Sequence, residues 1–427
     1  MMKKGGLTSF IILAMIVGIA VGYGVNWRAA ETGNAQLVVT FSKNIKLLTT
    51  IFLRLIQMVI APLVFTTLVV GIAKLGDLKT VGRVGGKAML WFVSASLVSL
   101  LLGLVLVNLT HPGTLIDLNE VNRLSQSKET VEAAGKVVAN AKGFSLEDFV
   151  LHVFPKSVFE AMSTNEILHI VVFAIFFGLA AAAMGDYAKP VIKGLDAAAH
   201  IVLKMVSYVM YFAPIGVFGA LAAVVAEKGL KVFVFYGWYM LAFLGGIVAL
   251  WIVLVGVGFL ILRKRMVPLL RHISNPLTIA FTTTSSEAVF PKLTEELERF
   301  GCKNKVVAFI LPLGYSFNLD GSMMYMTFAS IAIAQANGIP LDLGTQLTML
   351  LVLMLTSKGI AGVPRASLVV VAATCAMFNI PAIGIALILP IDHFCDMFRT
   401  ATNVLGNSLA TAVVSKWEGE LEVNQQP

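Results

Sequence analysis

The sequence predicts an all-α membrane protein that crosses the bilayer several times. Of its 427 residues, 58% are hydrophobic and only 13% are charged, about half the charged fraction of an ordinary soluble protein. The mean hydropathy is +0.86, and charge-free apolar stretches of about 20 residues, the length that spans a bilayer, recur along the chain. These observations exclude a soluble globular enzyme and a disordered chain.

Six stretches in the first two thirds of the chain have the length of a membrane span. They cover residues 5–27, 55–73, 88–116, 167–185, 205–226 and 232–262. The first stretch reaches Trp27 without a small-residue cleavage site, which favours a membrane helix over a cleaved signal peptide. Segment 117–166 is polar with mixed charges, and it is predicted to be an extracellular loop with some helix.

The positions of the basic residues that give the net charge of +8 agree with the predicted topology. With a cytoplasmic N-terminus, every basic cluster falls on the same side of the membrane, as the positive-inside rule requires. These clusters lie at residues 3–4, 74–87, 189–193 and 263–271. We therefore predict contact with membrane lipid and no nucleic-acid partner. The three cysteines lie far apart without ligand spacing, so neither a disulfide framework nor a metal site is predicted.

After residue 271 the apolar runs are interrupted by polar residues and glycines. Runs 273–286, 306–319 and 345–357 are too short to span a bilayer comfortably, and an uncharged run resumes over 366–391. Half-length segments suit re-entrant hairpins, whose irregular backbone is tolerated only inside protein or beside a cavity. In transporters, such segments point to the substrate site.

The strongest local pattern is a polar stripe on the predicted last helix. Its members, spaced by four, three, four and four positions, are Asp392, Asp396, Arg399, Asn403 and Asn407. At helical periodicity they share an arc of roughly 80°. An ion-pair stripe that fastens helices is the structural alternative, but ionisable residues within a span usually mark an ion or substrate path. The Arg399 fork suits a carboxylate and Asp396 suits an ammonium, so together they match an acidic amino acid.

Two further polar motifs interrupt the apolar runs. Residues 318–322 read Asn-Leu-Asp-Gly-Ser, where Gly321 permits unwound backbone whose carbonyls, with Asn318 and Asp320, could hold a small cation. A kinked or capped helix end is the alternative. Residues 283–287 read Thr-Thr-Ser-Ser-Glu, and hydroxyl and amide groups at such a hairpin tip can grip a carboxylate. Here the alternative is a solvated turn.

These three motifs, together with Gly-Ile-Ala-Gly-Val-Pro at 359–364 and Phe-Leu-Arg-Leu-Ile-Gln-Met at 52–58, resemble the dicarboxylate/amino acid:cation symporter family. This is the glutamate transporter family, and the likeness is to its bacterial proton/glutamate-aspartate symporters. The resemblance covers essentially the whole chain. It implies eight transmembrane helices plus two re-entrant helical hairpins with inverted repeats, and a homotrimer in the prokaryotic inner membrane.

The resemblance also implies two domains that move against each other in an elevator-type mechanism. Residues 1–85 would form scaffold helices one and two, and residues 116–230 the extracellular loop with scaffold helices four and five. Residues 86–115 would form helix three of the transport domain. Residues 231–420 would supply its helix six, first hairpin, helix seven, second hairpin and helix eight.

By the same resemblance, Arg399 binds the side-chain carboxylate of the substrate, Asp396 its amino group and Asn403 its α-carboxylate. Other residues would offer polar or backbone groups: Thr400, Ser322, Ser285, Ser286 and Val363. Relatives that carry C4-dicarboxylates tend to lack the aspartate at the place of Asp396, so its presence favours glutamate or aspartate. The alternatives are a C4-dicarboxylate substrate and an Asp396 that only pairs with Arg399.

Departures from the family pattern concern the coupling ion. Sodium-driven members carry Met at Leu319, Thr at Ser322 and Asp at Asn407, and by a softer alignment Ala95 replaces a threonine. A sodium ion needs several oxygen ligands and compensating negative charge. The sodium sites are therefore predicted to be degraded, proton coupling is preferred over sodium coupling, and no cofactor or bound metal is expected.

A proton carrier must be a carboxyl whose protonation depends on burial and on the state of the gate. Glu287 is the first candidate, because sodium-driven relatives carry a small residue there, and Asp320 is the second. Arg365 in the second hairpin could neutralise Glu287 across the closed site, or it could simply face the extracellular water. The complete set of candidates for ion or proton coupling is Glu287, Asp320, Asn318, Asp392, Gly314 and Asn407.

Two other function classes fit the sequence less well than a symporter does. An intramembrane hydrolase would use Ser285 or Ser286 with His393 and Asp392, but no nucleophile-elbow pattern occurs, so an enzyme is not predicted. Interrupted helices could also line a channel, but a channel cannot concentrate its substrate against a gradient.

Overall fold

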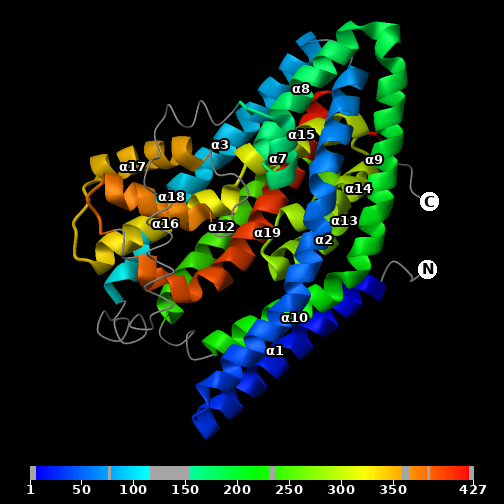
Figure 1. Ribbon diagram of the computed structural model, residues 1–427. Coiled ribbons are helices and arrows are strands. Elements are labelled where there is room, and N and C mark those ends of the chain that lie inside the picture. The colour runs from blue at the N-terminus through cyan, green and yellow to red at the C-terminus, as the bar shows by residue number, and fades with distance from the viewer. Residues whose placement is uncertain are drawn as a thin grey trace.

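The computed structural model describes residues 6–75, 78–115, 154–229, 236–357, 366–381 and 385–422. Within these ranges nearly every residue is helical and no β-strand forms; an isolated bridge joins Cys302 to Leu421 (Figure 1). Four helical segments are long and apolar enough to cross a membrane: Leu13–Thr32, Ala35–Ala73, Lys79–Thr110 and Gly237–Thr283. The predicted all-α architecture with several apolar helices is confirmed.

The first part of the chain contributes α1 (Gly6–Thr32), α2 (Ala35–Leu75), α3 (Leu78–Thr110), α7 (Val158–Thr164), α8 (Ile167–Ala183), α9 (Lys189–Val209) and α10 (Ala213–Lys228). The second part contributes α12 (Gly237–Leu262), α13 (Met266–Thr283), α14 (Phe290–Phe300), α15 (Asn304–Phe317), α16 (Asp320–Ala336), α17 (Leu343–Thr356), α18 (Ala366–Met377) and α19 (Ile385–Trp417).

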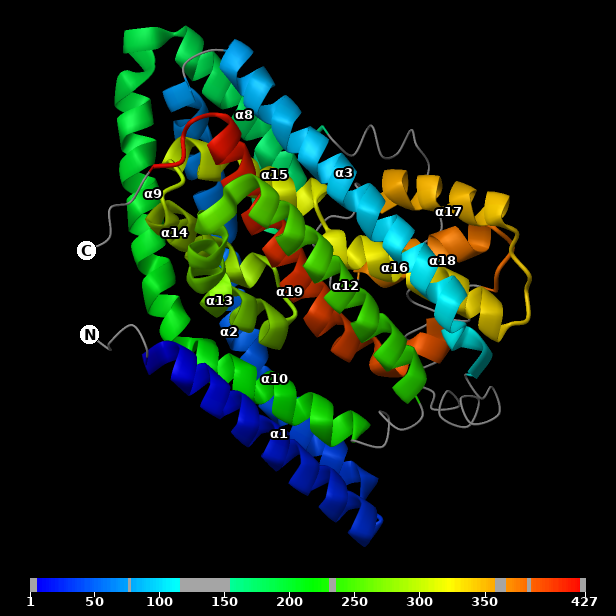
Figure 2. The same cartoon turned by 180° about the vertical axis from the view of Figure 1, so that it is seen from behind.

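Helices α1, α2 and α10 pack closely because glycines lie at their crossings. Helix α1 lies along α10 in both views (Figures 1 and 2). A Cβ atom on Gly18 would lie 2.9 Å from the Phe218 carbonyl oxygen, and one on Gly22 would lie 2.5 Å from that of Ala222. Small residues allow this close approach where lipid gives no hydrophobic drive for association. Helix α2 also packs against α8 and α9.

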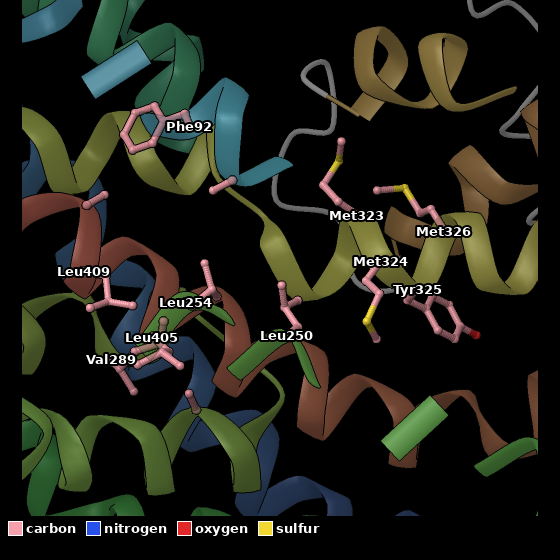
Figure 3. Packing of buried hydrophobic residues seen from close by; sticks show 14 of the residues in the cluster. Phe92, Leu250, Leu254, Val289, Met323, Met324, Tyr325, Met326, Leu405 and Leu409 are labelled. Atoms are coloured by element: carbon pink, nitrogen blue, oxygen red, sulfur yellow. The ribbon is translucent and has the colours of Figure 1, made fainter. Parts of the chain in front are cut away.

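The other helices gather around α19, which contacts α12, α13, α15 and α16. Helix α3 packs against α16. Buried Met323 and Met326 leave α16 on one side and buried Met324 on the other (Figure 3). A helix that is apolar all round belongs inside a bundle. The broken helix α15–α16 is thus enclosed by protein on all sides, which allows its backbone to unwind between the two parts.

The helix ends refine the predicted spans. Run 205–226 is divided, because α9 ends at Val209 and α10 begins at Ala213, with Pro214 in its first turn. Run 366–391 is divided as well, since α18 ends at Met377 before α19 begins. Runs 306–319 and 345–357 correspond to the short helices α15 and α17, of 14 residues each, whereas run 273–286 falls at the end of the 18-residue helix α13. Helices α13 and α14 flank a turn with left-handed Thr284, and α15 and α16 flank two non-helical residues.

Residues 418–422 form a C-terminal strap across one end of the bundle. Glu418 accepts hydrogen bonds from Arg83 at 2.9 Å and from Lys87 at 2.6 Å. Glu420 forms ion pairs with Lys303 at 2.7 Å and Lys305 at 2.6 Å. The strap therefore ties α19 to the beginnings of α3 and α15.

The Glu418→Gln variant is expected to lose stability at neutral pH. Burial opposes ionisation of Glu418, but hydrogen bonds from Arg83 and Lys87 outweigh it and hold the pKa of this carboxyl below its usual value. A lowered pKa in the folded state adds stability above the unfolded pKa of about 4.3, and this stability is lost as the pH falls through the folded value. The expected loss at pH 7 is about 1–2 kcal/mol.

Thermal unfolding of the purified protein at pH 7 and at acidic pH measures this effect. Glu422→Gln is the matched control, because this substitution removes the same charge from the same strap. The Glu422 side chain is exposed and forms no ion pair with a described residue. Equal losses of stability in the two variants, or a loss for Glu418→Gln that is as large at low pH as at pH 7, would contradict a stabilising role for the Glu418 ion pairs.

Candidate functional site

A buried ion-pair cluster lies on α19. The Arg399 Nη2 atom is 2.9 Å from Asp396 Oδ1 and 3.0 Å from Asp392 Oδ1. The side chains of Arg399 and Asp392 are fully buried, whereas that of Asp396 is 22% exposed. The predicted stripe thus brings three charges together, and of the three only Asp396 is open to a ligand from outside.

Tyr325 on α16 supports this cluster, and the sequence analysis missed it. Its hydroxyl donates to Asp392 Oδ1 at 3.0 Å, and the Arg399 Cζ atom lies 3.9 Å from the centre of its ring. A guanidinium over an aromatic face is attracted by the ring and is held in one plane. The sequence signal was weak, since Tyr325 lies in an otherwise apolar run after the 318–322 motif.

Arg399 keeps donor groups that its neighbours do not use. Within the described residues, its buried Nε and Nη1 atoms have no hydrogen-bond acceptor. Buried donors without an acceptor are costly, more so when charged. A planar fork with two free N–H directions fits a carboxylate. This arrangement can bind an acidic group that approaches past Asp396.

Asn403 joins α19 to the beginning of α16. Its Oδ1 atom accepts from the backbone amides of Gly321 at 2.9 Å and Ser322 at 3.2 Å, while its Nδ2 donates to Ser322 Oγ at 3.0 Å. It thereby satisfies amide groups that a helix start leaves without partners. Gly321 is required here, because a Cβ atom would lie 2.5 Å from the Arg399 carbonyl oxygen. Thr400 makes a long hydrogen bond of 3.5 Å to Asp396 Oδ1.

A second buried polar group lies where α15 and α16 are interrupted. Asn318 Nδ2 donates to Asp320 Oδ2 and to Asn407 Oδ1, both at 3.1 Å. Gly314 provides the space, since a Cβ atom there would overlap the Asn407 side chain, and its carbonyl accepts from the Asn318 amide at 2.8 Å. The group therefore contains one carboxylate and two neutral amides.

Two residues from the ion-coupling predictions do not belong to this second group: the candidate Asp392, and Ala95 from the predicted degraded sodium sites. Asp392 pairs with Arg399, and Ala95 is buried on α3 without a side-chain oxygen. Among the described residues, no three His, Cys, Asp or Glu side chains gather closely enough to hold a metal ion. Any cation held near Asp320 would depend largely on neutral oxygens.

The turn between α13 and α14 carries Ser285, Ser286 and Glu287, all half-buried. Ser285 Oγ accepts from the Ala288 amide at 3.2 Å, so its hydroxyl caps the turn. No basic side chain pairs with Glu287 among the residues that the structure describes. The turn packs against α2, while α13 reaches α19 through Phe281 and Phe398, whose rings are 4.9 Å apart.

The predicted contacts of the second hairpin tip lie outside the described residues. This applies to Val363 and Arg365, and to the whole segment 358–365. Arms α17 and α18 on either side are described, and α18 packs against α16.

Apolar helices of membrane length, interrupted helices inside the bundle and a buried charged site define a multi-pass membrane protein of transporter architecture. A profile of the family described as "Sodium:dicarboxylate symporter family" matches residues 7–417. The chain belongs to this family, whose members are cation-coupled transporters and not enzymes.

Similar proteins carry two different names. A "C4-dicarboxylate transport protein" of Geobacter sp. (strain M21) is 42% identical over 415 residues, covering 97% of this chain and 90% of that protein. A "Proton/sodium-glutamate symport protein" of Bacillus caldotenax is 37% identical over 430 residues, covering 98% and 96%. The family membership thus implies a small acidic substrate, dicarboxylate or glutamate.

Proposed function

We propose that the protein is a secondary active symporter that takes up glutamate and aspartate, driven by protons. The observation that carries the substrate assignment is Asp396, the partly exposed carboxylate 2.9 Å from the buried Arg399. A substrate with a side-chain carboxylate and an ammonium group would satisfy both residues at once: Arg399 through its free donors, and Asp396 through its charge.

Uptake of C4-dicarboxylates is the second candidate. It is favoured by the name of the Geobacter relative and by the ion pair between Asp396 and Arg399, in which the charge of Arg399 is already balanced by that of Asp396. In that case Asp396 would orient Arg399 and would meet no ammonium group. The two candidates differ in what they require of Asp396.

Proton coupling is supported by the composition of the second polar group. Asn407, a neutral amide, occupies the place where a carboxylate would add a second negative charge beside Asp320. Sodium in a site removed from water needs such compensation. Glu287 would carry the proton, because a half-buried carboxyl with no basic partner among the described residues crosses a membrane most easily when it is neutral.

The packing supports an elevator mechanism. Helices α1, α8, α9 and α10 each contact α2, while α12, α13, α15 and α16 each contact α19. We propose that residues 1–85 and 116–230 form a trimeric scaffold. Residues 86–115 and 231–420 would form the domain that carries the substrate across a prokaryotic inner membrane, with the N-terminus in the cytoplasm.

Uptake by reconstituted liposomes tests the function. Labelled glutamate would be supplied with an inward proton gradient without sodium, and then with an inward sodium gradient at equal pH. We expect accumulation above the external concentration with protons alone, and competition by aspartate. Accumulation only with sodium would overturn the coupling assignment, preferential transport of succinate would favour the second candidate, and equilibration without accumulation would indicate a channel.

The Glu287→Gln variant is expected to lose proton-driven accumulation by about tenfold or more, since an amide cannot release a proton. Exchange of internal for external glutamate should persist, because it needs no net proton movement. Glu296→Gln is the control in the same hairpin, where Glu296 pairs with Lys292 and His272. If Glu287→Gln retains full accumulation, Asp320 becomes the carrier to test.

A further inference from the structure

A basic pocket of about 530 Å³ lies where α12 ends, and neither the polar groups of the candidate site nor the proposed function involves it. Its lining consists of Leu262, Arg263, Lys264, Arg265, Lys416, Gly419 and Leu421. Four of these residues are basic and none is acidic. The pocket therefore concentrates positive charge at the end of the apolar, 26-residue helix α12.

The basic side chains of this pocket differ from their neighbours in having no acidic partner. The strap carboxylates form ion pairs with basic residues outside the pocket: Glu418 pairs with Arg83 and Lys87, and Glu420 pairs with Lys303 and Lys305. Within the described ranges, no carboxylate lies within ion-pair distance of the pocket's own cations. Their charge is available to an anion from outside.

Backbone contacts fix the shape of the pocket. Arg265 Nη1 donates to the Leu421 carbonyl oxygen at 3.2 Å, and Lys416 Nζ donates to that of Ile261. The strap thus forms one wall, and α19 is held to the end of α12. Arg263 and Lys264 remain exposed beside this fixed wall, in the short 3-10 turn Arg263–Arg265.

An exposed apolar stripe on α12 leads toward the pocket. Val248, Ile252 and Leu260 are 58%, 67% and 80% exposed, at helical spacing along one face. Gly256 lies between Ile252 and Leu260, and a Cβ atom added there would meet no other atom within 4 Å. The stripe therefore has a shallow gap in the middle, suited to a flexible hydrocarbon chain.

We propose that this pocket binds the phosphate of an anionic phospholipid, whose acyl chain lies along the Val248–Leu260 face of α12. Basic pockets between membrane helices suit lipid phosphates, and the adjoining apolar stripe distinguishes a lipid from a soluble phosphate. Both parts of the amphiphile find a matching surface at the depth where a bilayer would place them.

The test uses the full-length protein in neutral detergent, titrated with short-chain phosphatidylglycerol, with phosphatidylcholine of equal chain length, or with inorganic phosphate. The readout is the shift of the apparent melting temperature, which rises with any ligand that binds the folded state. We expect saturable stabilisation by phosphatidylglycerol alone. R263Q/K264Q should raise the half-saturating concentration about 25-fold, a factor of about five for each basic side chain. Lys416→Gln alone should raise it about fivefold.

The control is K189Q/K193Q, which removes two basic charges from the first part of α9, outside the lining of the pocket; Lys189 pairs with the exposed Asp186. It should leave the titration unchanged. If phosphatidylglycerol binding is weakened equally in this control, basic charge anywhere on the protein would explain the binding, and the proposal would be overturned. Stabilisation by inorganic phosphate to the same extent would overturn the lipid assignment. A pocket variant that melts normally and still responds as the parent does would also overturn it.

Discussion

The Arg399→Lys variant is expected to lose transport of acidic substrates by about 100-fold in uptake efficiency. Lysine keeps the positive charge between Asp392 and Asp396 but cannot offer the Nε and Nη1 donors that Arg399 holds free. Two charge-assisted hydrogen bonds to a carboxylate, at about 1.5 kcal/mol each, correspond to this factor. Lysine is chosen over alanine because removing the charge would leave two buried carboxylates without a counter-ion.

Initial rates of glutamate and succinate uptake over a range of concentrations measure this loss. Arg83→Lys provides the same chemical change at the strap, away from the site, and should transport normally. Melting temperature and size-exclusion behaviour establish that the variant is folded. An unchanged affinity for both substrates in a folded Arg399→Lys protein would remove Arg399 from the binding site.

The Asp396→Ser variant is expected to shift its substrate preference from acidic amino acids to C4-dicarboxylates. Glutamate and aspartate uptake should fall by about 10- to 100-fold, because their ammonium group loses a charged partner worth about 1.5–3 kcal/mol. Succinate and malate have no ammonium group, and Arg399 would be released from its 2.9 Å pair with Asp396. Their uptake should be retained or increased.

Competition of unlabelled amino acids and dicarboxylates against each labelled substrate measures this preference. The Asp396→Asn variant separates charge from hydrogen bonding, and it should also lose glutamate while leaving the side-chain volume nearly unchanged. Equal losses for glutamate and succinate would show that Asp396 only positions Arg399, as the second candidate function requires. Retained glutamate affinity in both variants would exclude Asp396 from contact with substrate.

Much of the fold was predictable because its determinants are local. Apolar length identifies α1, α3 and α12 from composition alone, since a span of hydrocarbon needs a span of apolar residues. Helix α9 was missed because Lys193, Asp196 and Lys204 interrupt its apolar residues. The division between α9 and α10 was missed for a related reason, since hydropathy does not register a helix break inside an apolar run.

The candidate site was predictable to the extent that it lies on one helix. Periodicity placed Asp392, Asp396 and Arg399 on a common face, and their ion pairs follow from that spacing. The basic residues after α12 were interpreted only as a topology signal, because the sequence shows their charge but not the strap residues that form one wall of the pocket.

Composition and periodicity establish that the chain is an α-helical membrane protein and that its last helix carries a charged face. The packing of the helices places Tyr325 beside Arg399, Asn403 at the beginning of α16 and Asn407 against Asn318. Periodicity specifies which face a helix presents, but the crossing of separate helices sets which side chains meet across that face.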